Sequence, residues 1–182
     1  ASIREGLTDR DMEILETVAI HRFLTTRQIC RFHFTDKSTK TAAVRSANRS
    51  LVKLRDLRIL VSLDRRIGGV RAGSGSFVWG LGQIGARLLH ETKRAEGAPA
   101  RYREHEPSTT FLKHTLAVAE VALRLAEAAR AGRFTIMDIQ HEPACWRAYN
   151  GSGGGTLRIK PDLAVVSATD DFEDHWFMEI DL

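Results

Sequence analysis

The stretch KTAAVRSANRSLVKLR, residues 40–55, determines how the first half of this chain is expected to fold. Its apolar residues recur at intervals of three and four, which is the spacing of one face of an α-helix. This spacing predicts a core-facing row made of Val44, Ala47, Leu51 and Leu54. The residues expected on the opposite, solvent-facing side are Thr41, Arg45, Asn48 and Arg49.

Two shorter helices are expected before this long one. Thr8, followed three residues later by Asp11, has the pattern of a helix start, and an apolar stripe at helical spacing follows it. A further threonine, Thr25 or Thr26, can cap a second helix. The first 60 residues therefore predict three helices.

A basic hairpin is expected after the long helix. Residues 60–63 and 77–79 have the composition of two strands, and the segment between them, RRIGGVRAGSGS (residues 65–76), is rich in glycine and arginine. Three helices followed by such a hairpin are typical of a winged helix-turn-helix domain, whose third helix enters the major groove of DNA. The residues predicted to contact DNA are Lys40, Thr41, Arg45, Asn48, Arg49, Arg65, Arg66 and Arg71.

The distribution of charge supports this interpretation. Residues 1–103 carry 20 Lys and Arg against 10 Asp and Glu, whereas residues 104–182 carry 7 against 13. A net charge of +10 on the first part favours a polyanionic partner, here double-stranded DNA. The acidic second part provides carboxylates for solvation or for metal binding.

Composition excludes several other classes of protein. No apolar run approaches 18 residues and no signal-peptide pattern is present, so we expect a cytoplasmic protein that does not bind membranes. Cys30 and Cys145 belong to no CxxC or CxxH pattern, which argues against a disulfide framework or a zinc site. Both cysteines are expected to be small buried residues.

The pattern predicts two domains. A short helix over residues 82–90 completes the first domain, residues 1–91, and residues 92–108 have no apolar periodicity and resemble a linker. The second domain, residues 109–182, opens with a helix over 109–131 that Gly132 ends.

The polar residues of that helix have ordinary explanations. Glu120 and Arg124 are spaced to form a surface ion pair. His114 falls in line with Val118 and Val121 on the apolar side, where a histidine is most often a hydrogen-bonded core residue, although it can also act as a ligand or base.

Three strands are expected after the helix, over residues 134–139, 157–166 and 175–182. Because side chains alternate along a strand, Leu157, Ile159, Leu163 and Val165 would share one face of the middle strand. Lys160 and Asp162 would share its other face. In the last strand, Trp176, Met178 and Ile180 would lie together, opposite Glu179 and Asp181.

This helix followed by strands with Pro161-Asp162 and Glu179-Ile180-Asp181 resembles the core of the PD-(D/E)xK nuclease fold. The resemblance implies a nuclease-like α/β domain in which Asp162 and Glu179 hold Mg²⁺ or Mn²⁺. The usual lysine is absent, because Asp181 stands in its place, and Lys160 is the candidate substitute. The candidate catalytic residues are Asp162, Glu179, Asp181, Lys160 and His114.

The whole chain is similar to a more specific family, the replication-relaxation proteins of actinobacterial plasmids and integrated elements. The resemblance rests on residues 8–15, 24–29, 50–55 and 79–85, and continues through His114, Pro161-Asp162 and residues 177–181. It implies a winged-helix DNA-binding domain followed by a nuclease-like domain, and a role in plasmid replication, DNA relaxation or transfer. It also implies that the chain continues beyond Leu182.

Three functions remain open from the sequence. The first is a DNA-binding protein of a plasmid or mobile element, with a second domain that is structural or mediates assembly. The second is a metal-dependent nuclease or nickase, and the third is a winged-helix transcriptional regulator. A homodimer is expected, because helix-turn-helix proteins commonly bind symmetric half-sites.

Overall fold

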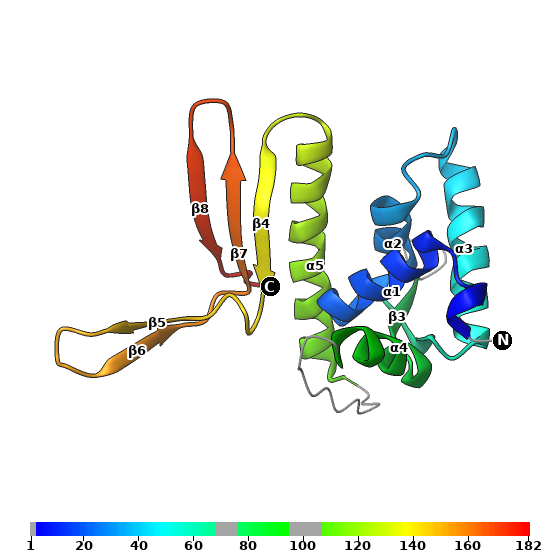
Figure 1. The fold of residues 1–182 in the computed structure, drawn as a ribbon, viewed down its shortest axis with the longest axis horizontal. Helices are drawn as coiled ribbons and strands as arrows, with labels where there is room; N and C mark the ends of the chain where they lie inside the picture. The colour runs from blue at the N-terminus through cyan, green and yellow to red at the C-terminus, as the bar shows by residue number, and fades with distance from the viewer. Residues whose placement is uncertain (1–2, 68–75, 95–106) are drawn as a thin grey trace. The chain divides into compact units, whose positions relative to one another are not determined.

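The computed structural model describes the backbone of residues 3–67, 76–94 and 107–182, and the side chains of residues 3–63, 77–91 and 107–182. The chain divides into two compact units, residues 1–116 and 117–182. Each unit combines helix with antiparallel strands, so the predicted α+β class is confirmed (Figure 1). The division falls inside a helix, whereas the boundary predicted at residues 92–108 lies largely outside the described residues.

Threonine caps define the starts of three helices in the first unit. Thr8 Oγ1 accepts the Asp11 N–H at 3.2 Å, and the Asp11 carboxylate accepts the Thr8 N–H at 3.0 Å, so both capping groups are paired. Thr25 and Gln28 repeat this capping box, and Thr39 caps the third helix through the Ala42 N–H. The three predicted helices are confirmed. They are α1 (Asp9–His21), α2 (Thr26–His33) and α3 (Lys40–Asp56), preceded by a short 3-10 helix, η1 (Ile3–Gly6).

An antiparallel sheet accompanies these helices. Its strands are β1 (Phe23–Thr25), β2 (Leu60–Ile67) and β3 (Ser76–Leu81), in the order β1-β3-β2. The two predicted strands of the hairpin, β2 and β3, are confirmed, and β1 was not predicted because three residues are too few to show alternation. The turn between β2 and β3, residues 68–75, lies outside the described residues and includes Arg71.

The buried face of α3 is shifted from the predicted one. Ala43, Ala47, Leu51 and Leu54 are buried, whereas Val44 is 45% exposed, so its placement in the core was wrong. At 100° of rotation per residue, Val44 lies roughly 65° to one side of the centre of the buried row. Ala43 takes its place against the core.

Two further helices complete the first unit. The predicted short helix is confirmed as α4 (Gln83–Arg94), and the long helix as α5 (Thr109–Arg130), whose first residues belong to this unit. Leu112 and Leu116 of α5 pack on Val78 of β3. Gln28 Nε2 donates to the Leu116 carbonyl at 3.0 Å, so α2 is also bonded to α5.

The second unit packs the rest of α5 on a three-stranded sheet. The strands are β4 (Thr135–His141), β7 (Leu163–Ala168) and β8 (Glu173–Met178), all antiparallel in the order β4-β7-β8. Val118, Val121 and Leu125 lie against Leu163 and Val165 in its core. The helix ends as predicted, since Gly132 adopts a φ of 74° just after it.

The middle strand predicted over residues 157–166 is two strands. Residues 156–159 form β6 (Thr156–Ile159), which pairs with the unpredicted β5 (Arg147–Asn150), and only β7 belongs to the main sheet. The shared face predicted for Leu157, Ile159, Leu163 and Val165 is therefore wrong: the first two are exposed and the last two are buried. Pro161 has no N–H to continue a ladder, so the chain changes sheet there.

The last strand also ends earlier than predicted. β8 stops at Met178, so Glu179, Ile180 and Asp181 lie beyond it, not within it. Met178 and Ile180 still pack on the core of the second unit, while Trp176 is 49% exposed and donates its indole N–H to Ser167 Oγ. In the described parts of the chain, we find no helix long and apolar enough to cross a membrane.

Candidate nucleic-acid interface

The exposed face of α3 is the strongest candidate for a binding surface in the first unit. The predicted contact residues Thr41, Arg45, Asn48 and Arg49 are all exposed on it. Val44 and Val52 are 45% and 43% exposed on the same face. Sequence reasoning missed these valines as surface residues, because their periodicity cannot be distinguished from that of core positions. The face therefore combines donors and acceptors with apolar side chains.

Hydrogen bonds to α1 and to the short helix η1 hold this helix in place. Lys53 Nζ on α3 donates to the buried Asp11 carboxylate and to the Gly6 carbonyl, both at 2.8 Å. Burial alone would raise the pKa of Asp11, but hydrogen bonds from Lys53 and Thr8 outweigh it and hold the pKa below its ordinary value. Asp11 is thus a charged anchor for α3.

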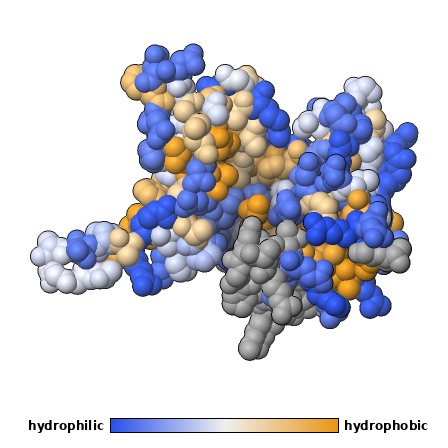
Figure 2. All heavy atoms as spheres, viewed as in Figure 1, coloured by the Kyte–Doolittle hydropathy of each residue, from blue (hydrophilic) through white to orange (hydrophobic). Residues whose placement is uncertain are grey.

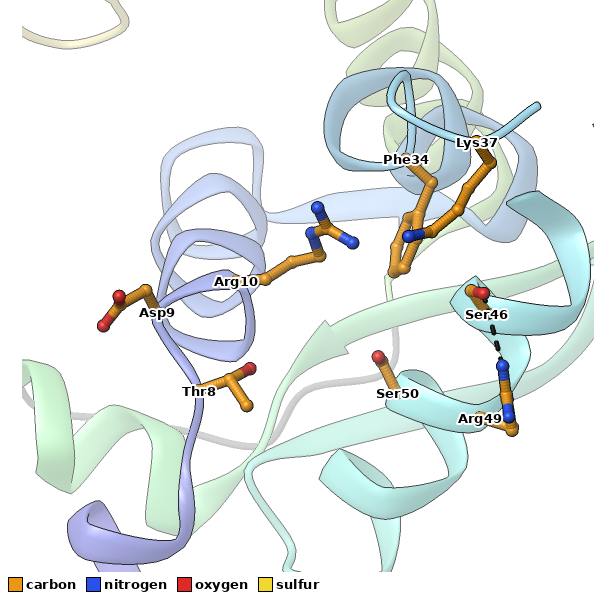
Figure 3. Close-up of a pocket in the computed structure, with 8 residues that line it drawn as sticks. All are labelled: Thr8, Asp9, Arg10, Phe34, Lys37, Ser46, Arg49 and Ser50. Atoms are coloured by element: carbon orange, nitrogen blue, oxygen red, sulfur yellow. Dashed lines mark hydrogen bonds between the residues drawn. The ribbon is translucent and has the colours of Figure 1, made fainter. Parts of the chain in front are cut away.

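An open pocket of about 460 Å³ lies beside α3 in the same unit. Figure 3 shows Arg10 and Lys37 directed into the space next to Phe34, while Asp9 turns away from them. Arg49, on the α3 side of the pocket, donates to Ser46 Oγ at 3.4 Å (Figure 3). The pocket is lined by three cations and by hydroxyl groups, which suits it to a phosphate oxygen.

Asp36 offsets part of this charge. Its carboxylate accepts hydrogen bonds from Lys37 at 2.9 Å and from Arg10 at 3.1 Å, and these bonds lower the pKa of Asp36. Arg10 also lies over the Phe34 ring, 5.0 Å from its centroid. Two of the three cations are therefore held in fixed positions. Arg10 and Lys37 were not among the residues predicted to contact DNA, because neither lies on the long helix or in the basic hairpin.

Of the three arginines predicted in the hairpin, the structure describes the backbone of two. Arg65 and Arg66 lie on β2, which is the strand that leads into the turn. Their side chains and the whole of Arg71 fall outside the described residues. Their role in DNA binding stays a prediction.

The structure gives Asp162 a structural role in the second unit. Asp162 is 6% exposed, and its Oδ2 accepts the Ile180 N–H at 2.8 Å. Its own N–H donates to the Met178 carbonyl at 2.9 Å. These bonds join the start of β7 to the end of β8, and they place Asp162 beside the segment that contains Glu179.

The other tentative catalytic residues are dispersed. Glu179 and Asp181 are exposed after β8, and Lys160 lies with its Nζ 4.9 Å from the centroid of the Trp146 ring. His114 is half-buried on the part of α5 that belongs to the first unit, whereas the carboxylates belong to the second. The ion pair predicted between Glu120 and Arg124 is confirmed at 3.3 Å.

A metal ion requires several ligand side chains that lie close together. Within the described side chains, no three His, Cys, Asp or Glu residues are grouped closely enough to hold a metal. Mg²⁺, however, commonly takes only one or two protein carboxylates and completes its shell with water and phosphate oxygens. The assignment of Asp162 and Glu179 as metal ligands therefore stays a prediction.

These features define a two-unit α+β protein with a polar, cationic helix face in one unit and carboxylates at a sheet end in the other. A family model described as replication-relaxation matches residues 15–182. The chain therefore belongs to the replication-relaxation family, which confirms the resemblance seen in the sequence. This membership suggests a role in the replication or relaxation of plasmid or mobile-element DNA. Comparison with curated proteins and with solved structures gave no match.

Proposed function

We propose that residues 1–116 form a winged helix-turn-helix domain that binds duplex DNA, and that the protein acts in the replication, relaxation or transfer of a plasmid or integrated element. One observation carries the proposal: α3 buries Ala43, Ala47 and Leu51 and turns Arg45 and Asn48 to solvent. A helix held in this way can enter the major groove with its polar face toward the bases.

The side chains on α3 match the chemistry of base edges. Arg45 can donate two hydrogen bonds to guanine, and Asn48 can pair with the hydrogen-bonding edge of adenine. Val44, exposed beside them, is suited to contact a thymine methyl group. The face therefore has the means to distinguish one sequence from another.

The surroundings of α3 suit the phosphate backbone. Arg10, Lys37 and Arg49 border the pocket beside the helix, and Arg65 and Arg66 lie on the strand that leads to the hairpin turn. Contacts of this kind position a protein on DNA without reading its sequence. They agree with the net charge of +10 on residues 1–103.

Selection of duplexes from a random library, followed by affinity measurements on the best site, tests the proposal. We expect Arg45→Ala and Asn48→Ala each to lower affinity for that site roughly 5- to 150-fold, and to lower affinity for unrelated duplexes far less. Arg87→Ala, an exposed arginine on α4, is the matched control. If Arg45→Ala and Arg87→Ala behave alike, α3 is not the recognition helix.

A second candidate function, metal-dependent nicking, is favoured by the position of Asp162 beside the Glu179 segment. When bound there, Mg²⁺ would stabilise charge on the phosphate that is cut. Asp162 and Glu179 would hold the ion, and Lys160 is the tentative group for orienting water.

Incubation of supercoiled plasmid with Mg²⁺ or Mn²⁺ tests this candidate. A nickase would relax the plasmid, and Glu179→Gln would abolish relaxation without unfolding an exposed site. Asp162→Ala is the companion variant, run with a circular dichroism spectrum because Asp162 also holds β7 to β8. Binding without relaxation would leave the second unit with a structural or assembly role.

A further inference from the structure

The second unit carries a two-stranded arm that no part of the proposed function uses. Among the described strands, β5 and β6 pair only with each other, with Arg147 opposite Ile159 and Asn150 opposite Thr156. Figure 1 shows this hairpin projecting away from the β4-β7-β8 sheet. Its turn, residues 151–155, is GSGGG, and its tip is white to blue in Figure 2. We refer to residues 146–160 as the β-arm.

The two faces of the β-arm differ in chemistry. Residues opposite one another in an antiparallel pair share a face, so Tyr149, Leu157 and Ile159 lie together with Arg147. Tyr149, Leu157 and Ile159 are 50%, 50% and 39% exposed. Arg158 and Lys160 lie on the other face, both exposed. One face of the arm is thus apolar and aromatic toward its turn, with Arg147 at its base, and the other face bears Arg158 and Lys160.

The charge of the β-arm is opposite to that of its surroundings. Residues 146–160 contain Arg147, Arg158 and Lys160 and no carboxylate. The rest of the second unit, residues 117–182, carries 3 basic and 11 acidic side chains. A cationic projection from an acidic body is suited to a polyanion, which the body itself would repel.

The base of the β-arm is held by specific contacts. Arg147 donates to Gln140 Oε1 on β4 at 2.7 Å and lies over the Phe177 ring of β8, so it anchors the arm to the sheet. Lys160 is placed over the Trp146 ring at 4.9 Å. Cys145, just before the arm, is buried and donates to the carbonyl of Pro161, just after it, at 2.9 Å. Arg158 and Lys160 therefore lie on an arm whose base is held in place.

We propose that the β-arm is a second DNA-binding element, which lies in a groove of duplex DNA with Arg158 and Lys160 on the phosphates and Tyr149 against the groove wall. The inference rests on the proposed function, since it adds a contact in the second unit to the one made by α3. A two-stranded ribbon fits the dimensions of a DNA groove. Basic side chains interleaved with exposed aromatic ones are the composition that nucleic acid binding requires.

The salt dependence of binding by the full chain tests the proposal. The probe is a fluorescent duplex of about four helical turns, with EDTA present so that no strand is cut. We expect the double variant Arg158→Ala/Lys160→Ala to bind about tenfold more weakly and to lower the slope of log K against log salt by about 1.8, because two phosphate contacts are lost. Arg124→Ala/Arg133→Ala removes the same charge from exposed sites on α5 and after it, and is the control.

A second variant tests the apolar face separately. Tyr149→Ala should weaken binding and leave the salt slope unchanged, since it removes a contact that releases no counterion. Tyr149 is half exposed, so its loss is not expected to unfold the unit. If Tyr149→Ala and wild type bind equally, the groove-wall contact is wrong.

The outcomes separate this inference from the proposed function. Equal affinity and slope for the double variant and its control would overturn the β-arm proposal while leaving recognition by α3 intact. Loss of binding in the double variant but not in Arg45→Ala would support the arm and overturn recognition by α3. If the wild-type chain binds no duplex at low salt, both proposals fail. If it binds single strands alone, the groove assignment is overturned.

Discussion

Lys53 on α3 and Asp11 on α1 form an ion pair across the first unit, with Nζ 2.8 Å from Oδ2. The Asp11 side chain is 3% exposed, while that of Lys53 is 40% exposed. Asp11 also completes the cap of α1 with Thr8, so one carboxylate fixes the start of one helix and the position of another. The orientation of the candidate recognition helix depends on this pair.

Lys53→Met should destabilise the first unit by about 1–2 kcal/mol, because it leaves the buried Asp11 carboxylate with fewer donors while keeping the alkyl stem. The exposure of Lys53 keeps the effect toward the lower end of that range. Urea unfolding followed by circular dichroism measures it. Arg55→Met, which breaks the exposed pair with Asp56, is the control and should change stability by less than about 0.5 kcal/mol.

The same pair predicts a dependence on pH. The pKa of Asp11 is lowered in the folded state, so its contribution is complete above the ordinary carboxyl pKa of about 4 and is lost as pH falls through the folded value. The stability difference between wild type and Lys53→Met should therefore narrow in acid. A difference that stays constant down to pH of about 2 would mean that Asp11 is not the partner that matters.

Local signals in the sequence were sufficient to predict where several helices begin or end. Thr8 and Thr25 each have a side-chain acceptor three residues later, so the cap and the helix start are encoded together. Gly132 ends α5 for a similar local reason. The inward or outward position of Val44 was not encoded in this way, because rotation of α3 about its axis depends on the residues of α1 and α2 that it meets.

The second unit could be predicted less well, since its strands depend on pairing between distant segments. Alternation continues from Leu157 to Val165 as if one strand ran through Pro161. Pro161 marks the point where the ladder is interrupted, and the pairing with β5 shows that two sheets are involved. For the same reason the β-arm and the backbone bond to Asp162 could not be foreseen. On α3, the residues that the sequence placed on the solvent-facing side are exposed, and their contact with DNA stays a prediction. The sequence left the geometry of the carboxylates open.

Gly85→Ala should destabilise the first unit by about 2 kcal/mol or more, because the added Cβ would lie 2.3 Å from the Ile59 carbonyl oxygen and 2.8 Å from Leu15 Cδ1. The Ile59 carbonyl is a backbone group and cannot move aside as the end of a flexible side chain can. The helix α4 would therefore have to shift away from the core. Thermal unfolding of the full chain measures the loss. Gly6→Ala, which meets nothing within 4 Å, is the matched control and should leave the midpoint within about a degree.

His141 on β4 should make the second unit sensitive to mild acid. Burial lowers the pKa of His141, so its stabilising contribution is present above the ordinary value of about 6.5 and is lost as pH falls through the lower folded value. The unfolding midpoint of wild type should drop between pH 8 and about 5.5 more than that of His141→Gln. His175→Gln, an exposed histidine paired with Glu173, should not flatten the curve in this way.

Arg49→Ala should separate positioning of the protein on DNA from reading of its sequence. Arg49 borders the pocket that also contains Arg10 and Lys37, so we expect it to contact a phosphate and not a base. Its loss should weaken binding to all duplexes by a similar factor and lower the salt slope by about 1, whereas Arg45→Ala should act mainly on the selected site. Fluorescence anisotropy on the selected duplex and on a scrambled one measures both quantities. Arg55→Ala, an arginine in the last turn of the same helix that is paired with Asp56, is the control. A loss confined to the selected duplex in Arg49→Ala would place Arg49 among the base-reading residues and leave the pocket without a role in binding.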